Sequence, residues 1–168
     1  MGMTRTLPTL WTSAGRSVAL FAVLFSGSML AAAYLFQFVG GMAPCQMCYW
    51  QRWAHWTVLA FGLAGVIVPR VRIWPWLIIL ALLASSLVAG FHAGVEYGWW
   101  EGPKACTGGG AGPTDTSTVF GALAEPIDVV DCSEPAWVML GISMAGWNAL
   151  ASFGAFLLSL IMTLKTKT

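Results

Sequence analysis

Charged residues are scarce in this chain. They make up 9% of its 168 residues, against about 25% in an average soluble domain, while hydrophobic residues make up 58%. A soluble fold of this length could not bury so much apolar surface, so the composition excludes a soluble globular domain and indicates a protein dissolved in lipid. The net charge of +1 gives no reason to expect nucleic acid as a partner. The length fits a single membrane domain, residues 1–168.

The sequence also lacks the motifs of common redox cofactors. It has no glycine-rich dinucleotide fingerprint and no haem-attachment motif. A zinc site built from two close-spaced cysteine pairs is disfavoured because Cys106 and Cys132 lie far apart in the chain, and we expect no metal. Any redox chemistry must therefore depend on the four cysteines and on an acceptor from outside the chain.

Long apolar runs, by contrast, are present. A membrane-spanning helix needs about 20 residues. The sequence predicts four such helices, and hence an all-α bundle of four transmembrane helices, at residues 17–39, 48–68, 73–95 and 137–164. Ala31-Ala32-Ala33 resembles a signal-peptide cleavage site, but the apolar run continues through Phe36 and Phe38, which favours a span.

The distribution of charge predicts the orientation of these helices. Six of the eight basic residues lie before the first span, between the second and third, or after the fourth. All seven acidic residues lie between Glu96 and Glu134. The positive-inside rule therefore places both termini in the cytoplasm and the loops 40–47 and 96–136 outside. Within the long loop, the glycine-rich stretch 107–113 is expected to be irregular, and residues 119–123 to form a short helix at the membrane surface.

All four cysteines fall on the predicted outer side, where disulfides are expected. They allow three pairings, and the sequence does not choose among them. A bridge between Cys106 and Cys132 would stabilise the fold by roughly 3.5 kcal/mol on the chain-entropy model. A bridge between Cys45 and Cys48 would close too short a loop to act mainly as a staple, whereas C-x-x-C is the spacing of redox dithiols.

Several polar residues accompany the Cys45–Cys48 pair. Arg52 and His55 follow Cys48 at i+4 and i+7, on one face of the second span. Arg52 is interpreted either as snorkelling to the interface or as stabilising a Cys48 thiolate and an electron acceptor beside it. His55 is interpreted as an interfacial anchor or is left without a role, and His92 as an interfacial side chain or a donor to the acceptor. Asn148, in the fourth span, is expected to hydrogen-bond another helix.

At this point the chain resembles a known family. The run Pro44-Cys45-Gln46-Met47-Cys48-Tyr49-Trp50-Gln51-Arg52 is similar to the signature of the bacterial disulfide bond formation protein B (DsbB) family. The four spans, the cysteine pair of the second outer loop, His92 before it and the Trp137 to Ala145 segment after it also resemble that family. The resemblance extends over residues 15–165 and implies a thiol:quinone oxidoreductase of the bacterial inner membrane, its cysteine loops in the periplasm.

The resemblance also implies roles for the cysteines. Cys106 would be attacked by a soluble DsbA-like thiol oxidase, and Cys132 would be released to exchange with Cys45. Cys48 would then be freed as a thiolate against the ring of ubiquinone or menaquinone. Arg52 would support that contact and His92 would lie near the quinone. Position 51 departs from members that carry Glu, and the glycine-rich stretch after Cys106 is this chain's own.

Two other functions are consistent with parts of the sequence. A vitamin K epoxide reductase-like enzyme is also a helix bundle with paired cysteines, but its C-x-x-C lies in a later span. A structural four-span protein with stable disulfides would need neither a reactive Cys45–Cys48 pair nor Arg52.

Overall fold

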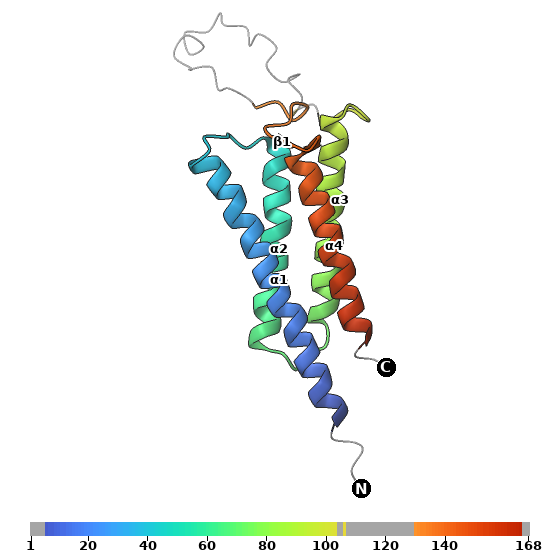
Figure 1. The fold of residues 1–168 in the computed structure, drawn as a ribbon. Coiled ribbons are helices and arrows are strands. Elements are labelled where there is room, and N and C mark those ends of the chain that lie inside the picture. Colours follow the sequence, from blue (N-terminus) through green and yellow to red (C-terminus); the bar gives the residue numbers. More distant parts are fainter. Residues whose placement is uncertain (1–5, 104–105, 107–129, 166–168) are drawn as a thin grey trace, which may run out of the picture.

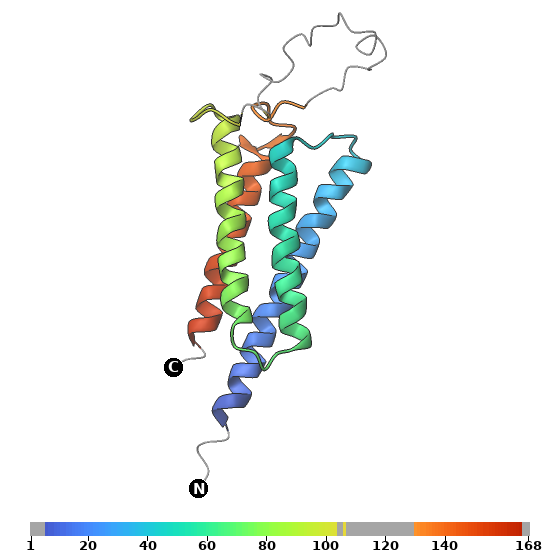
Figure 2. The same cartoon turned by 180° about the vertical axis from the view of Figure 1, so that it is seen from behind.

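The computed structural model describes residues 6–103, 106 and 130–165, with only the backbone described for residues 6–14. Four helices form the bundle: α1 (Thr6–Phe38), α2 (Gln46–Ile67), α3 (Trp74–Glu96) and α4 (Met144–Lys165). Helix α1 begins and α4 ends at the same end of the bundle, as Figures 1 and 2 show. The stretches 107–113 and 119–123, predicted to be irregular and helical, lie outside the described residues.

Three helices are long and apolar enough to cross a membrane by themselves: Gly15–Phe38, Trp74–Glu96 and Met144–Lys165, with mean hydropathies of 2.0, 2.1 and 1.6. Helix α2 is long enough but does not join them, because its first turns carry Gln51, Arg52 and His55. All three of these polar residues are buried among the other helices. The predicted all-α, four-helix architecture is confirmed.

Small residues allow α1 and α2 to pack closely. A Cβ atom on Gly62 would lie 2.9 Å from Val23 Cγ2 and 3.1 Å from the Ala19 carbonyl oxygen. All four helices contribute to the hydrophobic core around this contact. Its fully buried members include Val18, Val58, Ile78 and Leu82. Apolar side chains fill this core, and the cavity that could hold a ligand lies toward the cysteines.

Local sequence explains where α2 begins. Helix α1 ends before Gly40, where a Cβ would lie 2.6 Å from the Phe36 carbonyl oxygen, and Gly41 takes a positive φ of 67°. The chain then turns in a few residues to Cys45, which is the N-cap of α2 and accepts a bond from the Cys48 backbone N–H at 3.3 Å. This short turn fixes the C-x-x-C pair at the helix N-terminus.

The segment 137–164 was predicted to be one helix, and its first part is not. Residues Val138–Met139 (β1) and Ile142–Ser143 (β2) form a small antiparallel hairpin before α4. Leu140 and Gly141 make its two-residue turn, with φ values of 54° and 78°, as turns of type I′ require. Tyr97 ties the hairpin to α3: its hydroxyl accepts from Ser143 N–H at 3.0 Å and donates to the Gly141 carbonyl at 3.2 Å.

Candidate functional site

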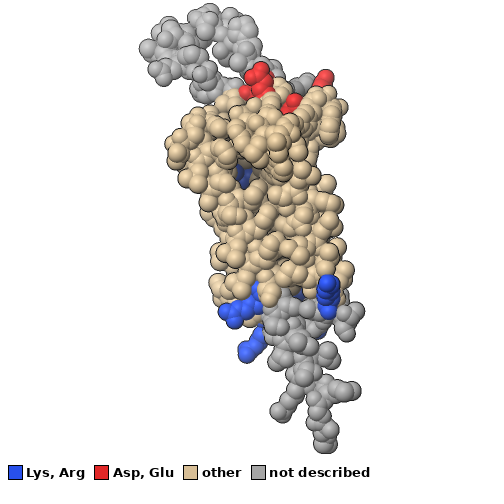
Figure 3. All heavy atoms as spheres, in the orientation of Figure 1, with Lys and Arg blue, Asp and Glu red and all other residues tan. Residues whose placement is uncertain are grey.

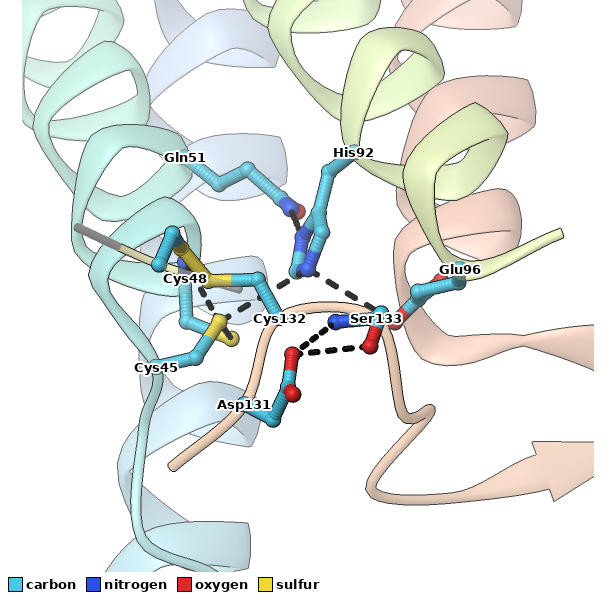
Figure 4. Close-up of a disulfide and its surroundings, with 9 residues drawn as sticks. Cys45, Cys48, Gln51, His92, Glu96, Asp131, Cys132 and Ser133 are labelled. Atoms are coloured by element: carbon cyan, nitrogen blue, oxygen red, sulfur yellow. Dashed lines mark hydrogen bonds and ion pairs between the residues drawn. A yellow bond between two sulfur atoms is a disulfide. The ribbon is translucent and has the colours of Figure 1, made fainter. Parts of the chain in front are cut away.

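The four cysteines meet at one end of the bundle. Cys45, Cys106 and Cys132 are buried in a single cluster with Met47 and Val95, and Cys48 packs against it. Cys106 and Cys132 form a disulfide, with their Cα atoms 5.3 Å apart, whereas Cys45 and Cys48 are free thiols. Figure 4 shows Cys132 of the loop lying beside Cys45 and Cys48 of α2. The structure therefore brings the two pairs together although they are distant in sequence.

The free pair is arranged so that its two sulfurs differ. Cys45 Sγ donates to Cys48 Sγ across 2.9 Å. This hydrogen bond, followed by burial, raises the pKa of the Cys45 thiol well above its usual range. Cys48 receives that hydrogen bond and sits in the first turn of α2, where the helix dipole favours an anion. The geometry thus keeps the proton on Cys45 and directs nucleophilic character to Cys48.

Two side chains from α3 complete the cluster. His92 Nε2 lies 3.6 Å from Cys45 Sγ and 3.7 Å from Glu96 Oε1, and both His92 and Glu96 are buried. The other ring nitrogen of His92 is 2.5 Å from the Gln51 side-chain amide nitrogen. His92 therefore lies beside the cysteine cluster, and its role toward an electron acceptor stays a prediction. Glu96 was not predicted, although its spacing of i+4 from His92 would have placed both on one helix face.

A cavity of about 350 Å³ opens beside the cysteines. Its walls are mostly apolar side chains of α1 and α4, and its polar members include Cys48, Arg52 and His92. Cys45, Gln51, His55 and Glu96 line the same cavity. Typical ligand pockets occupy about 300–1,000 Å³ and combine an apolar lining with a few placed polar groups. This cavity has the size and lining of a site for a small, largely apolar ring with polar substituents.

Arg52 is held by helix α1 and does not extend to solvent. It is 9% exposed, Nη1 donates to Gln37 Oε1 at 2.5 Å and Nη2 donates to the Ala33 carbonyl at 3.3 Å. The guanidinium also lies over the rings of Tyr34 and Tyr49, 4.8 and 5.5 Å from their centroids. These contacts argue against snorkelling and fix the charge at the cavity wall.

His55 is not the interfacial anchor that one interpretation suggested. It is 3% exposed, lies between Ser26 and Asn148, and contacts the Asn148 carbonyl oxygen through Nε2 at 2.9 Å. Asn148 in turn donates to Gln51 Oε1 at 2.6 Å. The expectation that Asn148 bonds another helix is therefore confirmed, and its partners are two residues of α2.

Metal-ligating atoms also come together here. The sulfurs of Cys45 and Cys48 and a ring nitrogen of His92 lie within 4.8 Å of one another. The expectation of no metal rested on the spacing of cysteines along the sequence, which takes no account of a histidine from another helix. It stays a prediction.

Acidic and basic groups separate along the bundle. In Figure 3 the described Lys and Arg side chains gather mainly at the end where α1 begins and α4 ends, and Asp and Glu at the end of the cysteine cluster. At that acidic end, Asp131 accepts from both the backbone N–H and the hydroxyl of Ser133 at 2.8 Å. These hydrogen bonds, the one from the backbone foremost, lower the pKa of Asp131 and so favour its charged form.

Comparison with known proteins gives a consistent result. Disulfide bond formation protein B from Actinobacillus pleuropneumoniae (serotype 5b, strain L20) is 30% identical over 158 residues, which cover 90% of this chain and 87% of the relative. Its counterpart from Azoarcus sp. (strain BH72) is 33% identical over 143 residues, covering 82% and 84%. Disulfide bond formation protein B 2 of Pseudomonas aeruginosa (PAO1) is 32% identical over 144 residues, covering 76% and 78%.

No solved structure matches the chain significantly. The family model described as disulfide bond formation protein DsbB matches residues 15–162, which include α2 and α3, most of α1 and α4, and all four cysteines. Together with two cysteine pairs gathered at one end of a four-helix membrane bundle, this match shows that the chain belongs to the DsbB family of disulfide bond formation proteins.

Proposed function

We propose that this protein re-oxidises a soluble, periplasmic DsbA-type thiol oxidase and passes the electrons through its two cysteine pairs to a membrane quinone, ubiquinone or menaquinone. The observation that carries the proposal is the burial of a loop disulfide and a free C-x-x-C pair in one cluster beside an apolar cavity. Thiol–disulfide exchange needs sulfurs in contact, and electron transfer to a lipid-soluble acceptor needs a site open to apolar ligands.

The loop pair is proposed as the entry point for electrons. A thiolate of the soluble partner attacks the Cys106 sulfur, the bond to Cys132 breaks, and a mixed disulfide forms. The partner's second thiol then displaces Cys106, so the partner leaves oxidised and the loop pair is left as a dithiol. Two electrons and two protons have moved from the partner to Cys106 and Cys132.

The pair on α2 is proposed as the exit. The Cys132 thiolate attacks Cys45 of an oxidised Cys45–Cys48 bridge and releases Cys48 as a thiolate. Cys106 then attacks Cys132, which restores the loop disulfide and leaves Cys45 and Cys48 reduced. The pairing in the structure, a loop disulfide with two free thiols on α2, corresponds to this stage of the sequence.

A quinone fits the residues that line the cavity. A bound quinone supplies an acceptor for two electrons and two protons. The apolar side chains of α1 and α4 would pack on its ring, the Arg52 guanidinium would donate hydrogen bonds to its oxygens, and His92 would lie beside it in the cavity wall. Cys48 would face it with thiolate character, and Cys45 holds the proton that must leave when the pair becomes a disulfide.

The proposed orientation follows from charge. Arg16 lies in the first part of α1, Arg70 and Arg72 lie between α2 and α3, and Lys165 ends α4. The positive-inside rule assigns this end of the bundle to the cytoplasm of a bacterial inner membrane. The first three proposed spans, 17–39, 48–68 and 73–95, and the helical part of the fourth, 144–164, then place the loops 40–47 and 96–136 in the periplasm. The hairpin at 138–143 would lie at the outer surface.

The test uses the purified full-length protein with ubiquinone-1 or a soluble menaquinone analogue and a reduced DsbA-type protein. We expect quinone absorbance to fall as partner thiols are lost, one quinone for each disulfide made. Cys48→Ser should abolish this turnover, and Ser86→Ala, which alters an α3–α4 contact away from the cysteines, should retain it. Loss of partner thiols without loss of either quinone would refute the proposed acceptor.

A further inference from the structure

A chain of buried polar side chains leads away from the cysteine cluster into the bundle. It joins His92 of α3, Gln51 and His55 of α2, Asn148 of α4 and Ser26 of α1. Each of the five is at most 8% exposed. The proposed electron route uses His92 only, so the remainder of this chain has no role in it.

The hydrogen bonds of the chain determine the direction of each amide. Gln51 Oε1 accepts from Asn148 Nδ2 at 2.6 Å, so the amide nitrogen of Gln51 is the atom facing His92. Since that nitrogen can only donate, the His92 Nδ1 atom 2.5 Å away must accept and carry no proton. The proton of a neutral His92 is then on Nε2, the atom that lies between Cys45 Sγ at 3.6 Å and Glu96 Oε1 at 3.7 Å.

The same logic extends to the far end of the chain. Asn148 Oδ1 accepts from the Ser152 hydroxyl at 3.2 Å and faces His55 Nε2 at 2.9 Å. His55 therefore carries its proton on Nε2, and its Nδ1 faces the Ser26 hydroxyl at 3.3 Å. Each contact from Ser26 to His92 can thus pair one donor with one acceptor.

We propose that His55 and Asn148 are positioning residues: the hydrogen-bond chain from Ser26 through His55, Asn148 and Gln51 holds His92 in its Nε2–H form, directed at Cys45. The inference rests on the proposed function, in which Cys45 loses its proton as the Cys45–Cys48 disulfide forms, and two electrons, that proton and one further proton from water pass to the quinone. The Nε2–H group stabilises the Cys45 sulfur as it becomes anionic. Because amide N–H groups do not release protons, the chain orients His92 and does not conduct protons.

A merely structural chain would stabilise the bundle without fixing one tautomer. Nitrogen NMR distinguishes a positioning role from a merely structural one, because it reports which ring nitrogen carries the proton. The protein contains only two histidines, and their four ring nitrogens can be assigned with a His55→Gln variant. The experiment uses full-length protein labelled with ¹⁵N-histidine in lipid nanodiscs, with Cys45 and Cys48 reduced and without quinone. We expect both rings as Nε2–H in the wild type.

Two variants test the links. Gln51→Glu replaces the amide donor with a carboxylate of similar shape, so His92 should change to the Nδ1–H form. Asn148→Leu frees the Gln51 amide to rotate, so His92 should show a mixture of both forms. Ser86→Ala, which removes a bond from α3 to the Ala149 carbonyl outside the chain, should leave the His92 signals unchanged.

The functional arm measures the single-turnover rate of quinone reduction by protein whose Cys45–Cys48 pair is reduced. Because Asn148 also lines the cavity, rates are compared at saturating quinone, where Asn148→Leu should lower the rate about tenfold, equivalent to about 1.4 kcal/mol. A wild-type His92 protonated on Nδ1, an unchanged tautomer in Gln51→Glu, or a rate in Asn148→Leu equal to that of Ser86→Ala would each overturn the inference. Absence of quinone reduction in the wild type would instead refute the proposed function.

Discussion

The charge of Arg52 gives the sharpest test of the cavity. Cys48 and Arg52 are separated by four positions on α2, a spacing at which side chains start about 5–6 Å apart. Opposite unit charges about 6 Å apart, at an effective dielectric constant of about 20, attract by about 2.8 kcal/mol. Removing the charge with Arg52→Met should therefore lower kcat/KM for quinone about a hundredfold, because negative charge at Cys48 and on the acceptor loses its counter-charge.

A lysine at position 52 separates charge from geometry. The guanidinium spans the Gln37 side chain and the Ala33 carbonyl, and a lysine ammonium lacks the planar fork needed to do so. Arg52→Lys keeps the charge but should lose one such bond, about 1.5 kcal/mol, and hence about tenfold in kcat/KM. We therefore expect kcat/KM for quinone to fall from wild type to Arg52→Lys and again to Arg52→Met.

The assay is quinone reduction at varied quinone concentration, with reduced thiol partner in excess. Arg70→Met serves as the matched control, since it removes a positive charge from the opposite end of the bundle. Because Arg52 is buried, the ratio of wild-type to Met rates should change little between low and high salt. Equal kcat/KM in wild type and Arg52→Met, with both proteins folded, would show that Arg52 only ties α1 to α2.

Three further outcomes are expected. Cys106→Ser should block oxidation of the thiol partner yet still allow a reduced Cys45–Cys48 pair to reduce added quinone; normal partner turnover would refute the relay order. Adding quinone to reduced protein should produce a visible absorption band that Cys48→Ser lacks, and a band that survives this substitution would assign the contact to another residue. Gly62→Ala should lower thermal stability in detergent by about 1–3 kcal/mol, because the new Cβ would lie 2.9 Å from Val23 Cγ2 and 3.1 Å from the Ala19 carbonyl; an unchanged melting temperature would show that the helices can separate at no cost.

Much of the architecture could be predicted because membrane helices leave a strong signal in one dimension. Long apolar runs, three of them uncharged, predicted the four helices. The start of α4 could not be predicted in this way. Residues 137–143 are apolar enough to continue the helix toward its N-terminus. The hairpin instead requires a positive φ at Leu140, and a leucine gives no sequence signal for that conformation.

The site could be predicted in part for a related reason. The C-x-x-C spacing and the cation at i+4 are local, so Cys45, Cys48 and Arg52 could be singled out from the sequence. Which side chains meet across helices is a property of packing. The partnership of His55 with Asn148 depends on the relative rotation and depth of α2 and α4, which periodicity along one helix does not determine.

The burial of the loop disulfide has a consequence for electron leakage. Cys106 and Cys132 are 1% and 0% exposed, against Cys45 and close to the cavity. While the loop rests there, dissolved thiols have no access to its sulfurs, and a protein partner must draw Cys106 out of the cluster before it can react. On the proposed route, contact with the donor and contact with Cys45 then exclude each other in time. On that route, the buried disulfide would keep small dissolved thiols from passing electrons to the quinone.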